Sequence, residues 1–124
     1  MIPAGESSYT LETRSDYIVM RITGVYNSRQ FLGYPQIMLD ACRKADVKKI
    51  LVDATLVDFS NLSTMERYLL GEEFGQVVSY HLAIAILVRE ELITNFLETV
   101  ATNRGAKMFV SSENDKALAW LASA

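Results

Sequence analysis

Two short runs of apolar residues constrain the fold of this chain more than any other feature. One is Ile50–Val52 and the other lies within His81–Val88, and a segment with helical periodicity runs between them. Apolar runs of this length are typical of strands that are buried on both faces, as in a parallel sheet. Parallel strands need a crossover connection, which is usually a helix. We therefore expect a parallel sheet covered by helices.

Strand signals also occur nearer the two ends of the chain. Tyr9–Thr13 and Tyr17–Thr23 are rich in residues that favour strands, and Ser15 and Asp16 between them suit a tight turn. This pattern predicts an N-terminal hairpin, which adds one antiparallel strand at an edge of the sheet. Lys107–Val110 is predicted to be a short final strand.

Four segments are predicted to be helical. Apolar residues recur at helical spacing over Ser28–Ala45, where Pro35 either belongs to the first turn or kinks the helix near its start. Ser63–Val77 has the clearest helix signal. The other two are Glu90–Asn103, followed by Gly105 in a position that suits a left-handed C-cap, and a last helix opened by Ser112.

The helix over Ser63–Val77 begins with a Ser-x-x-Glu capping box. In this motif the side chains of Ser63 and Glu66 each accept a backbone N–H that the start of the helix leaves free. The apolar face of the helix is expected to comprise Met65, Leu69 and Phe74, with Tyr68 and Leu70 beside them.

The element order β-β-α-β-α-β-α-β-α predicts an α/β domain with a mixed sheet, in which three parallel βα units follow the hairpin. A length of 124 residues fits one domain over residues 1–124, with residues 1–8 as a loose tail. The net charge of −3 gives no indication of nucleic-acid binding. One cysteine, no signal-peptide pattern and no apolar run long enough for a membrane span predict a cytoplasmic protein.

The residue inventory gives no support for an enzyme, a cofactor or a metal site. The chain has one histidine and one cysteine, too few for the usual structural zinc site, and it lacks the glycine-rich phosphate loops and the G-x-S-x-G nucleophile elbow. Cys42 at an apolar helix position and His81 at the start of a buried strand are predicted to be structural.

Asp53 is expected to end a buried strand, at the edge of the sheet where ligands bind in open α/β folds. An aspartate in this position is similar to the phosphoacceptor of response-regulator receivers. Receivers, however, open with one parallel strand and an acidic pair, whereas this chain opens with a hairpin. We therefore predict that Asp53 is a strand-end polar residue that accepts loop N–H groups.

Two stretches resemble STAS domains, the domains shared by sulphate transporters and anti-sigma-factor antagonists. RITGVYN, over Arg21–Asn27, is similar to their second-strand signature, with Gly24 and Tyr26 in place and Asn27 replacing an aspartate. Lys48–Gly71 resembles the central signature, a strand ending in aspartate followed by an apolar loop and Asp-Ser-Ser-Gly at a helix start. The matching positions there are Asp53, Val57, Phe59, Asn61, Leu62, Ser63 and Thr64.

The resemblance implies the fold of the sporulation stage II protein AA-like superfamily and a non-catalytic function. STAS proteins of this kind bind an anti-sigma factor or a kinase-like regulator, and the second serine of the signature is phosphorylated. Here that serine is Ser63, which has an alternative role as a plain helix N-cap. The implied partner-binding residues are Asn27, Phe59, Asn61, Ser63 and Thr64. A homodimer is left open.

A second hypothesis comes from the apolar residues predicted around the small sheet. The chain could instead carry a small, lipid-like apolar ligand, for which it would need a concave apolar pocket with a few polar groups. The side chains that motivate this alternative are Phe59, Leu62, Met65, Tyr68, Phe74 and Phe96.

Overall fold

Five strands form one mixed sheet in the computed structural model, which describes residues 5–94, 96 and 107–124. The strands follow one another across the sheet in chain order, β1-β2-β3-β4-β5. Their bounds are Ser7–Thr13 for β1, Ile18–Val25 for β2, Lys49–Asp58 for β3, Ala83–Leu87 for β4 and Lys107–Ser111 for β5. β1 pairs antiparallel with β2 at one edge, and all other pairs are parallel, which confirms the predicted mixed sheet.

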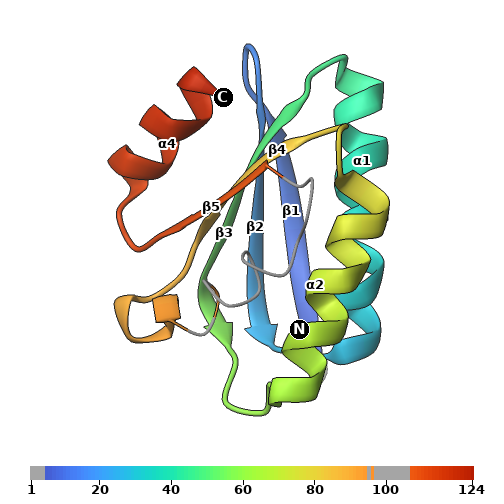
Figure 1. Ribbon diagram of the computed structural model, residues 1–124, viewed down its shortest axis with the longest axis vertical. Helices are drawn as coiled ribbons and strands as arrows, with labels where there is room; N and C mark the ends of the chain where they lie inside the picture. The colour runs from blue at the N-terminus through green and yellow to red at the C-terminus, as the bar shows by residue number, and fades with distance from the viewer. Residues whose placement is uncertain (1–4, 95, 97–106) are drawn as a thin grey trace.

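Helices cover both faces of the sheet. α1 (Ser28–Ala45) and α2 (Thr64–Val78) lie on one face, and α4 (Asn114–Ser123) lies on the other (Figure 1). A short 3-10 helix, η1 (Glu90–Leu92), follows β4. Among the described residues no helix is long and apolar enough to cross a membrane.

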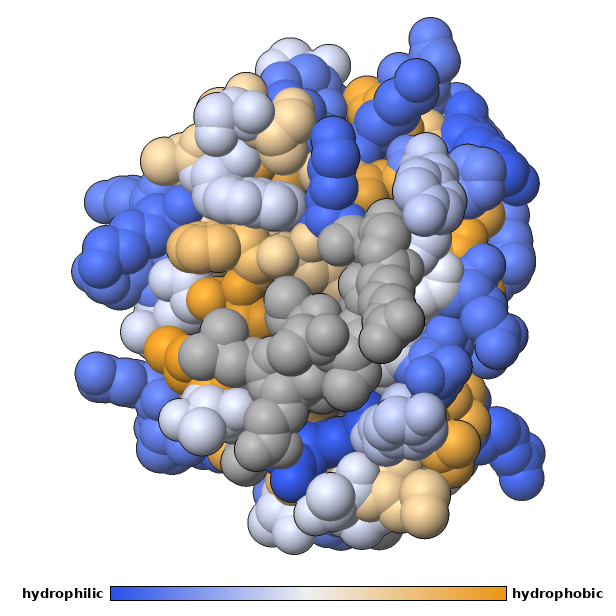
Figure 2. All heavy atoms as spheres, in the orientation of Figure 1, coloured by the Kyte–Doolittle hydropathy of each residue, from blue (hydrophilic) through white to orange (hydrophobic). Residues whose placement is uncertain are grey.

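The pleat of the strands divides the core into two clusters, because neighbouring residues of a strand point to opposite faces. Ile18, Met20 and Ile22 of β2 point toward α1 and α2, whereas Val19 points toward α4. The smaller cluster around α4 comprises Val19, Leu51, Ala83, Ala85, Leu87, Ala117 and Leu121. Hydrophilic side chains predominate along both flanks of the molecule, where the helices face water, and apolar side chains gather nearer the middle of the view (Figure 2).

Several predicted boundaries were wrong. β1 begins at Ser7, which is buried, so the loose tail cannot extend to residue 8. β3 does not end at Asp53 but continues to Asp58, because β2 keeps pairing with it through Val25 after a bulge. The last helix begins at Asn114 rather than Ser112.

One helix prediction is tested only at its start. Glu90–Leu92 is a 3-10 helix and Ile93, Thr94 and Phe96 are helical, but most of the predicted helix Glu90–Asn103 lies outside the described residues. The same is true of the predicted cap at Gly105.

Candidate functional site

Ser63 lies at the N-terminal end of α2 and is the N-cap of that helix. Its backbone is extended, and its hydroxyl accepts a hydrogen bond from the backbone N–H of Glu66 at 3.1 Å. The side chain is exposed. The predicted helix start is therefore confirmed, and the Ser63 oxygen sits where free N–H groups and the positive end of the helix dipole meet.

The predicted capping box pairs the side chain of Glu66 with the backbone N–H of Ser63, whereas the structure pairs it with a tyrosine. The Glu66 carboxylate interacts with the hydroxyl of Tyr26, which follows β2 and is buried. Burial raises the pKa of Tyr26 to about 12, and the charge and hydrogen bond of Glu66 add to this effect. The Tyr26 hydroxyl therefore stays protonated at neutral pH and joins α2 to the end of β2.

Asn27 organises the start of α1 and the segment before β1. Its side-chain oxygen accepts the N–H of Gln30 at 3.1 Å, as an N-cap, and its amide donates to the carbonyl of Gly5 at 3.1 Å. Asn27 is half-buried. The structure thus gives both polar ends of this candidate partner-binding residue an internal role.

Asn61 and Phe59 shape the loop between β3 and α2. The Asn61 amide donates to the carbonyl of Tyr26 at 2.9 Å, which ties this loop to the end of β2. Phe59 is only 6% exposed and packs among aromatic rings, with centroids 5.7 Å from Phe31 and 5.0 Å from Phe96. Phe59 therefore lies beneath the loop, and Asn61 is the exposed member of this pair.

Thr64 begins α2 and is exposed beside Ser63. Its hydroxyl accepts a hydrogen bond from the Arg67 guanidinium at 3.2 Å, one turn further along the helix. This contact brings a positive charge close to the N-terminal end of α2.

Asp53 lies in the middle of β3, so its assignment to the end of the strand was wrong. The pairing with β4 ends at Asp53, and its carboxylate accepts the N–H of Thr55 at 3.1 Å and the Thr55 hydroxyl at 2.6 Å. Asp53 thus accepts one backbone N–H, which comes from the bulged strand itself and not from a loop. Asp58 ends the strand instead, and bonds from Ser60 hold the pKa of its exposed carboxyl below the usual value.

No protein-family model matches this sequence, and no curated protein matches it. Solved structures do match. An anti-sigma factor antagonist from Mycobacterium paratuberculosis is 11% identical with a TM-score of 0.65, over 98% of this chain and 99% of that one. The anti-sigma factor antagonist SpoIIAA in its unphosphorylated form is 12% identical with a TM-score of 0.55, over 94% and 98%.

This chain has the fold of the anti-sigma factor antagonists. A third structure, an uncharacterised protein with a SpoIIAA-like fold from Shewanella loihica, agrees, with 19% identity and a TM-score of 0.54 over 98% of both chains. The SpoIIAA-like fold that the STAS signatures predicted is thereby confirmed.

On this SpoIIAA-like fold, α2 carries an exposed apolar stripe that the sequence analysis placed in the core. Met65 is 67% exposed, Tyr68 51% and Leu69 47%, at the i, i+3 and i+4 positions of one helix face. The buried face comprises Leu70, Gly71, Phe74 and Val78. The stripe begins two residues after Ser63, so exposed apolar side chains directly follow the exposed N-cap.

The end of the SpoIIAA-like sheet where β3, β4 and β5 begin, opposite the end that carries Ser63, is basic. A cleft of about 380 Å³ there is lined by Lys48, Lys49, Tyr80, His81, Leu82, Ala83, Lys107 and Ala124. His81 is exposed and precedes β4, so its prediction as the first residue of a buried strand was wrong. α1, α2 and α4 all terminate at this end of the sheet, and the Lys49 ammonium donates to the Ala122 carbonyl at 3.2 Å. Lys49 thus complements the negative end of the α4 dipole.

The described side chains that motivated the carrier hypothesis differ in their surroundings. Phe59, Phe74 and Phe96 are buried in the core, whereas Met65 and Tyr68 point outward.

Cys42 is buried, and desolvation raises the pKa of its thiol to about 11, so the thiol is protonated and unreactive at neutral pH.

The cap geometry predicts the effect of removing the Ser63 hydroxyl. Ser63→Ala should lower the free energy of unfolding by about 1 kcal/mol, whereas Ser63→Asp should retain most of the stability because aspartate also caps helices. Chemical denaturation measures both. Ser28→Ala, at the exposed first residue of α1, is the control and should have a small effect. Equal midpoints for Ser63→Ala and wild type would mean that the hydroxyl does not cap α2.

Proposed function

We propose that this chain is a non-catalytic regulatory module that binds a protein partner through the N-terminal end of α2. The observation that carries the proposal is the exposed Ser63 N-cap followed directly by the exposed stripe Met65, Tyr68 and Leu69. Apolar side chains exposed together on one helix face are typical of interaction sites. The fold shared with anti-sigma factor antagonists supports an anti-sigma factor or a kinase-like regulator as the partner, in the cytoplasm.

Within this proposal the candidate residues have two kinds of role. Ser63 and Thr64 are exposed and contact the partner directly, together with Asn61. Asn27 and Phe59 act indirectly, since Asn27 caps α1 and Phe59 is buried beneath the loop. Substitution of these two residues should therefore affect folding as well as binding.

Phosphorylation of Ser63 is the proposed switch. A phosphate adds nearly two negative charges at pH 7, and a helix N-terminus tolerates them because its N–H groups and dipole favour anions. Across an interface, the same charges must lose water against the partner. An apolar surface that fits the stripe would disfavour this, so the fold should persist while the complex weakens.

The test compares wild type with three variants, one of which is a matched control. Wild type, Ser63→Ala, Ser63→Asp and Ser15→Asp are used to capture partners from lysate, after circular dichroism has established that each is folded. Ser15→Asp adds the same charge at the exposed hairpin turn. Loss of one specific protein with Ser63→Asp alone supports the proposal. Equal capture by all four proteins, or no specific partner at all, contradicts it.

A further inference from the structure

The outer edge of β1 carries backbone groups that bond to nothing else in the described molecule. Two hydrogen bonds at the ends of the hairpin show which backbone groups of β1 face β2. The N–H of Val25 donates to the Glu6 carbonyl at 3.0 Å, and the N–H of Arg14 donates to the Tyr17 carbonyl at 2.8 Å. In an antiparallel ladder both groups of one residue point to the same side. The register is continuous from Ser7 to Thr13, so the even-numbered residues bond to β2. The odd-numbered residues point outward from the sheet.

The backbone groups of one outward-pointing residue, Ser7, already have a hydrogen-bond partner. The Gln30 side chain of α1 accepts the N–H of Ser7 at 2.7 Å and donates to its carbonyl at 3.0 Å, as a neighbouring strand would. No hydrogen bond from the described residues reaches the outward groups of Tyr9, Leu11 and Thr13. Gln30 therefore closes one end of the edge and leaves three residues open.

The β1 edge also lacks the features that prevent an edge strand from pairing with a strand of another molecule. Native edges are protected by lysine, proline, bulges or short strands. β1 has seven residues, contains neither lysine nor proline, and pairs with β2 without a bulge. Tyr9 is 39% exposed and Leu11 43%, and both lie on the α1 side of the sheet, where Tyr9 packs against Tyr34.

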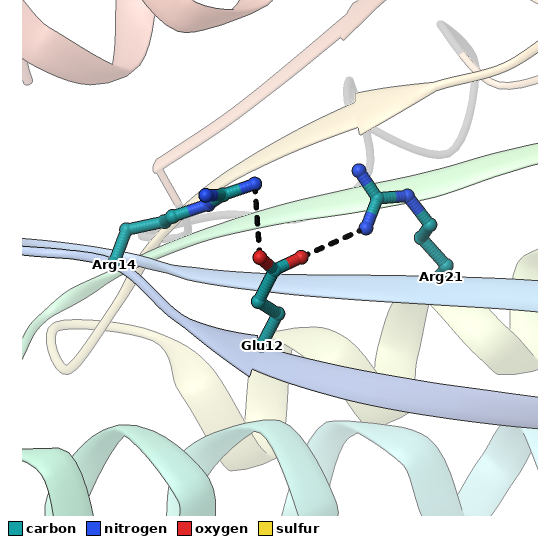
Figure 3. Close-up of polar contacts among 3 residues, drawn as sticks. All are labelled: Glu12, Arg14 and Arg21. Carbon is teal, nitrogen blue, oxygen red and sulfur yellow. Dashed lines mark hydrogen bonds and ion pairs between the residues drawn. The ribbon is translucent and has the colours of Figure 1, made fainter.

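The single charged residue of β1 is neutralised within its own chain. The carboxylate of Glu12 lies between Arg14 and Arg21, at 3.1 Å from each guanidinium (Figure 3). Its side chain is directed across the sheet face toward β2 rather than out from the edge (Figure 3). Glu12 therefore does not repel a strand that approaches β1.

We infer that a second copy of this chain pairs with the β1 edge, antiparallel and about a two-fold axis at Leu11. This register places Leu11 opposite Leu11 and Tyr9 opposite Thr13, so it uses the three open residues of each copy. Glu12 then lies opposite Thr10 rather than opposite another Glu12. The strand is thus complementary to itself in hydrogen bonding and apolar contact and does not place Glu12 opposite Glu12, as a two-fold interface requires.

Sedimentation of two matched leucine variants tests the surface used. Leu11 and Leu69 are exposed to nearly the same extent, 43% and 47%, on different elements. Wild type should shift from monomer to dimer over a concentration series. Leu11→Lys should remain monomeric, because two lysines would meet at the axis, and Leu69→Lys should dimerise like wild type. A wild type that stays monomeric, or a dimer lost only in Leu69→Lys, overturns the inference.

Cross-linking tests the register. Residues opposite each other in a hydrogen-bonded pair have Cα atoms about 5.5 Å apart, within reach of a disulfide. Under mild oxidation Leu11→Cys should therefore give a covalent dimer. Thr13→Cys should not, since two copies of residue 13 would be displaced by about 13 Å along the strands. Equal or faster cross-linking of Thr13→Cys would exclude this register, and cross-linking of neither variant would contradict the paired edge. Cys42 is buried and does not interfere.

Discussion

Ile84→Ala should lower the free energy of unfolding by about 3 kcal/mol. Ile84 is the second residue of β4, lies between Ile50 of β3 and Met108 of β5, and is 0% exposed. The alanine side chain would leave a cavity in the core cluster beneath α1 and α2, where close packing limits relaxation. Urea denaturation followed by circular dichroism measures the loss as a lower midpoint with an unchanged slope.

Leu56→Ala is the control for this prediction. It also shortens an aliphatic side chain in a central strand, but Leu56 is 74% exposed on β3. Substitutions at such exposed positions usually change stability by less than about 0.5 kcal/mol. If Ile84→Ala cost no more than Leu56→Ala, β4 could not lie at the centre of the core.

Elements with strong local signals could be predicted from the sequence. The limits of α1, Ser28–Ala45, agree with the prediction because the apolar spacing is regular and Asn27 caps the start. Pro35 is accommodated within the helix and is buried against the core. The hairpin and the parallel strands were predictable for the same reason, since each is encoded in a short stretch of residues.

The continuation of β3 past Asp53 depends on contacts that are distant in sequence. The run after Val52 mixes polar and apolar residues, which locally resembles a loop. It becomes a strand because Gly24 and Val25 of β2 pair with Val57 and Asp58 beyond the bulge. No pattern within the segment itself indicates that partner.

The candidate site was predictable in position but not in detail. The Ser-x-x-Glu motif located the N-cap at Ser63, since capping is a local interaction. Apolar residues occur all around α2, so periodicity could not decide which face is buried. That choice follows from packing against α1 and leaves Met65, Tyr68 and Leu69 outside. The roles of Asn27 and Asn61 also depend on partners in other elements, Gly5 and Tyr26.

Gly24→Ala should destabilise the fold by about 2 to 4 kcal/mol, through backbone strain and a steric clash. Gly24 has φ +98°, in a region that residues with a Cβ rarely adopt. A Cβ at this position would lie 2.6 Å from the Glu6 carbonyl oxygen and 3.0 Å from the Ser7 Cα. These are backbone atoms of the first residue of β1 and of the residue before it, and they cannot rotate away. The same Glu6 carbonyl accepts the N–H of Val25, so relieving the clash would break the start of the β1–β2 ladder.

Gly33→Ala is the matched control, because it adds the same methyl group without either problem. Gly33 lies in α1 and is exposed, and no atom outside its own helix turn lies within 4 Å of the place that an alanine Cβ would occupy. Alanine is favoured over glycine within a helix, so this variant should gain about 0.5 to 1 kcal/mol. Thermal and chemical unfolding of the two variants should therefore differ in sign. A Gly24→Ala protein as stable as wild type would mean that β1 does not approach β2 closely at this point, and that the ladder begins later in the chain.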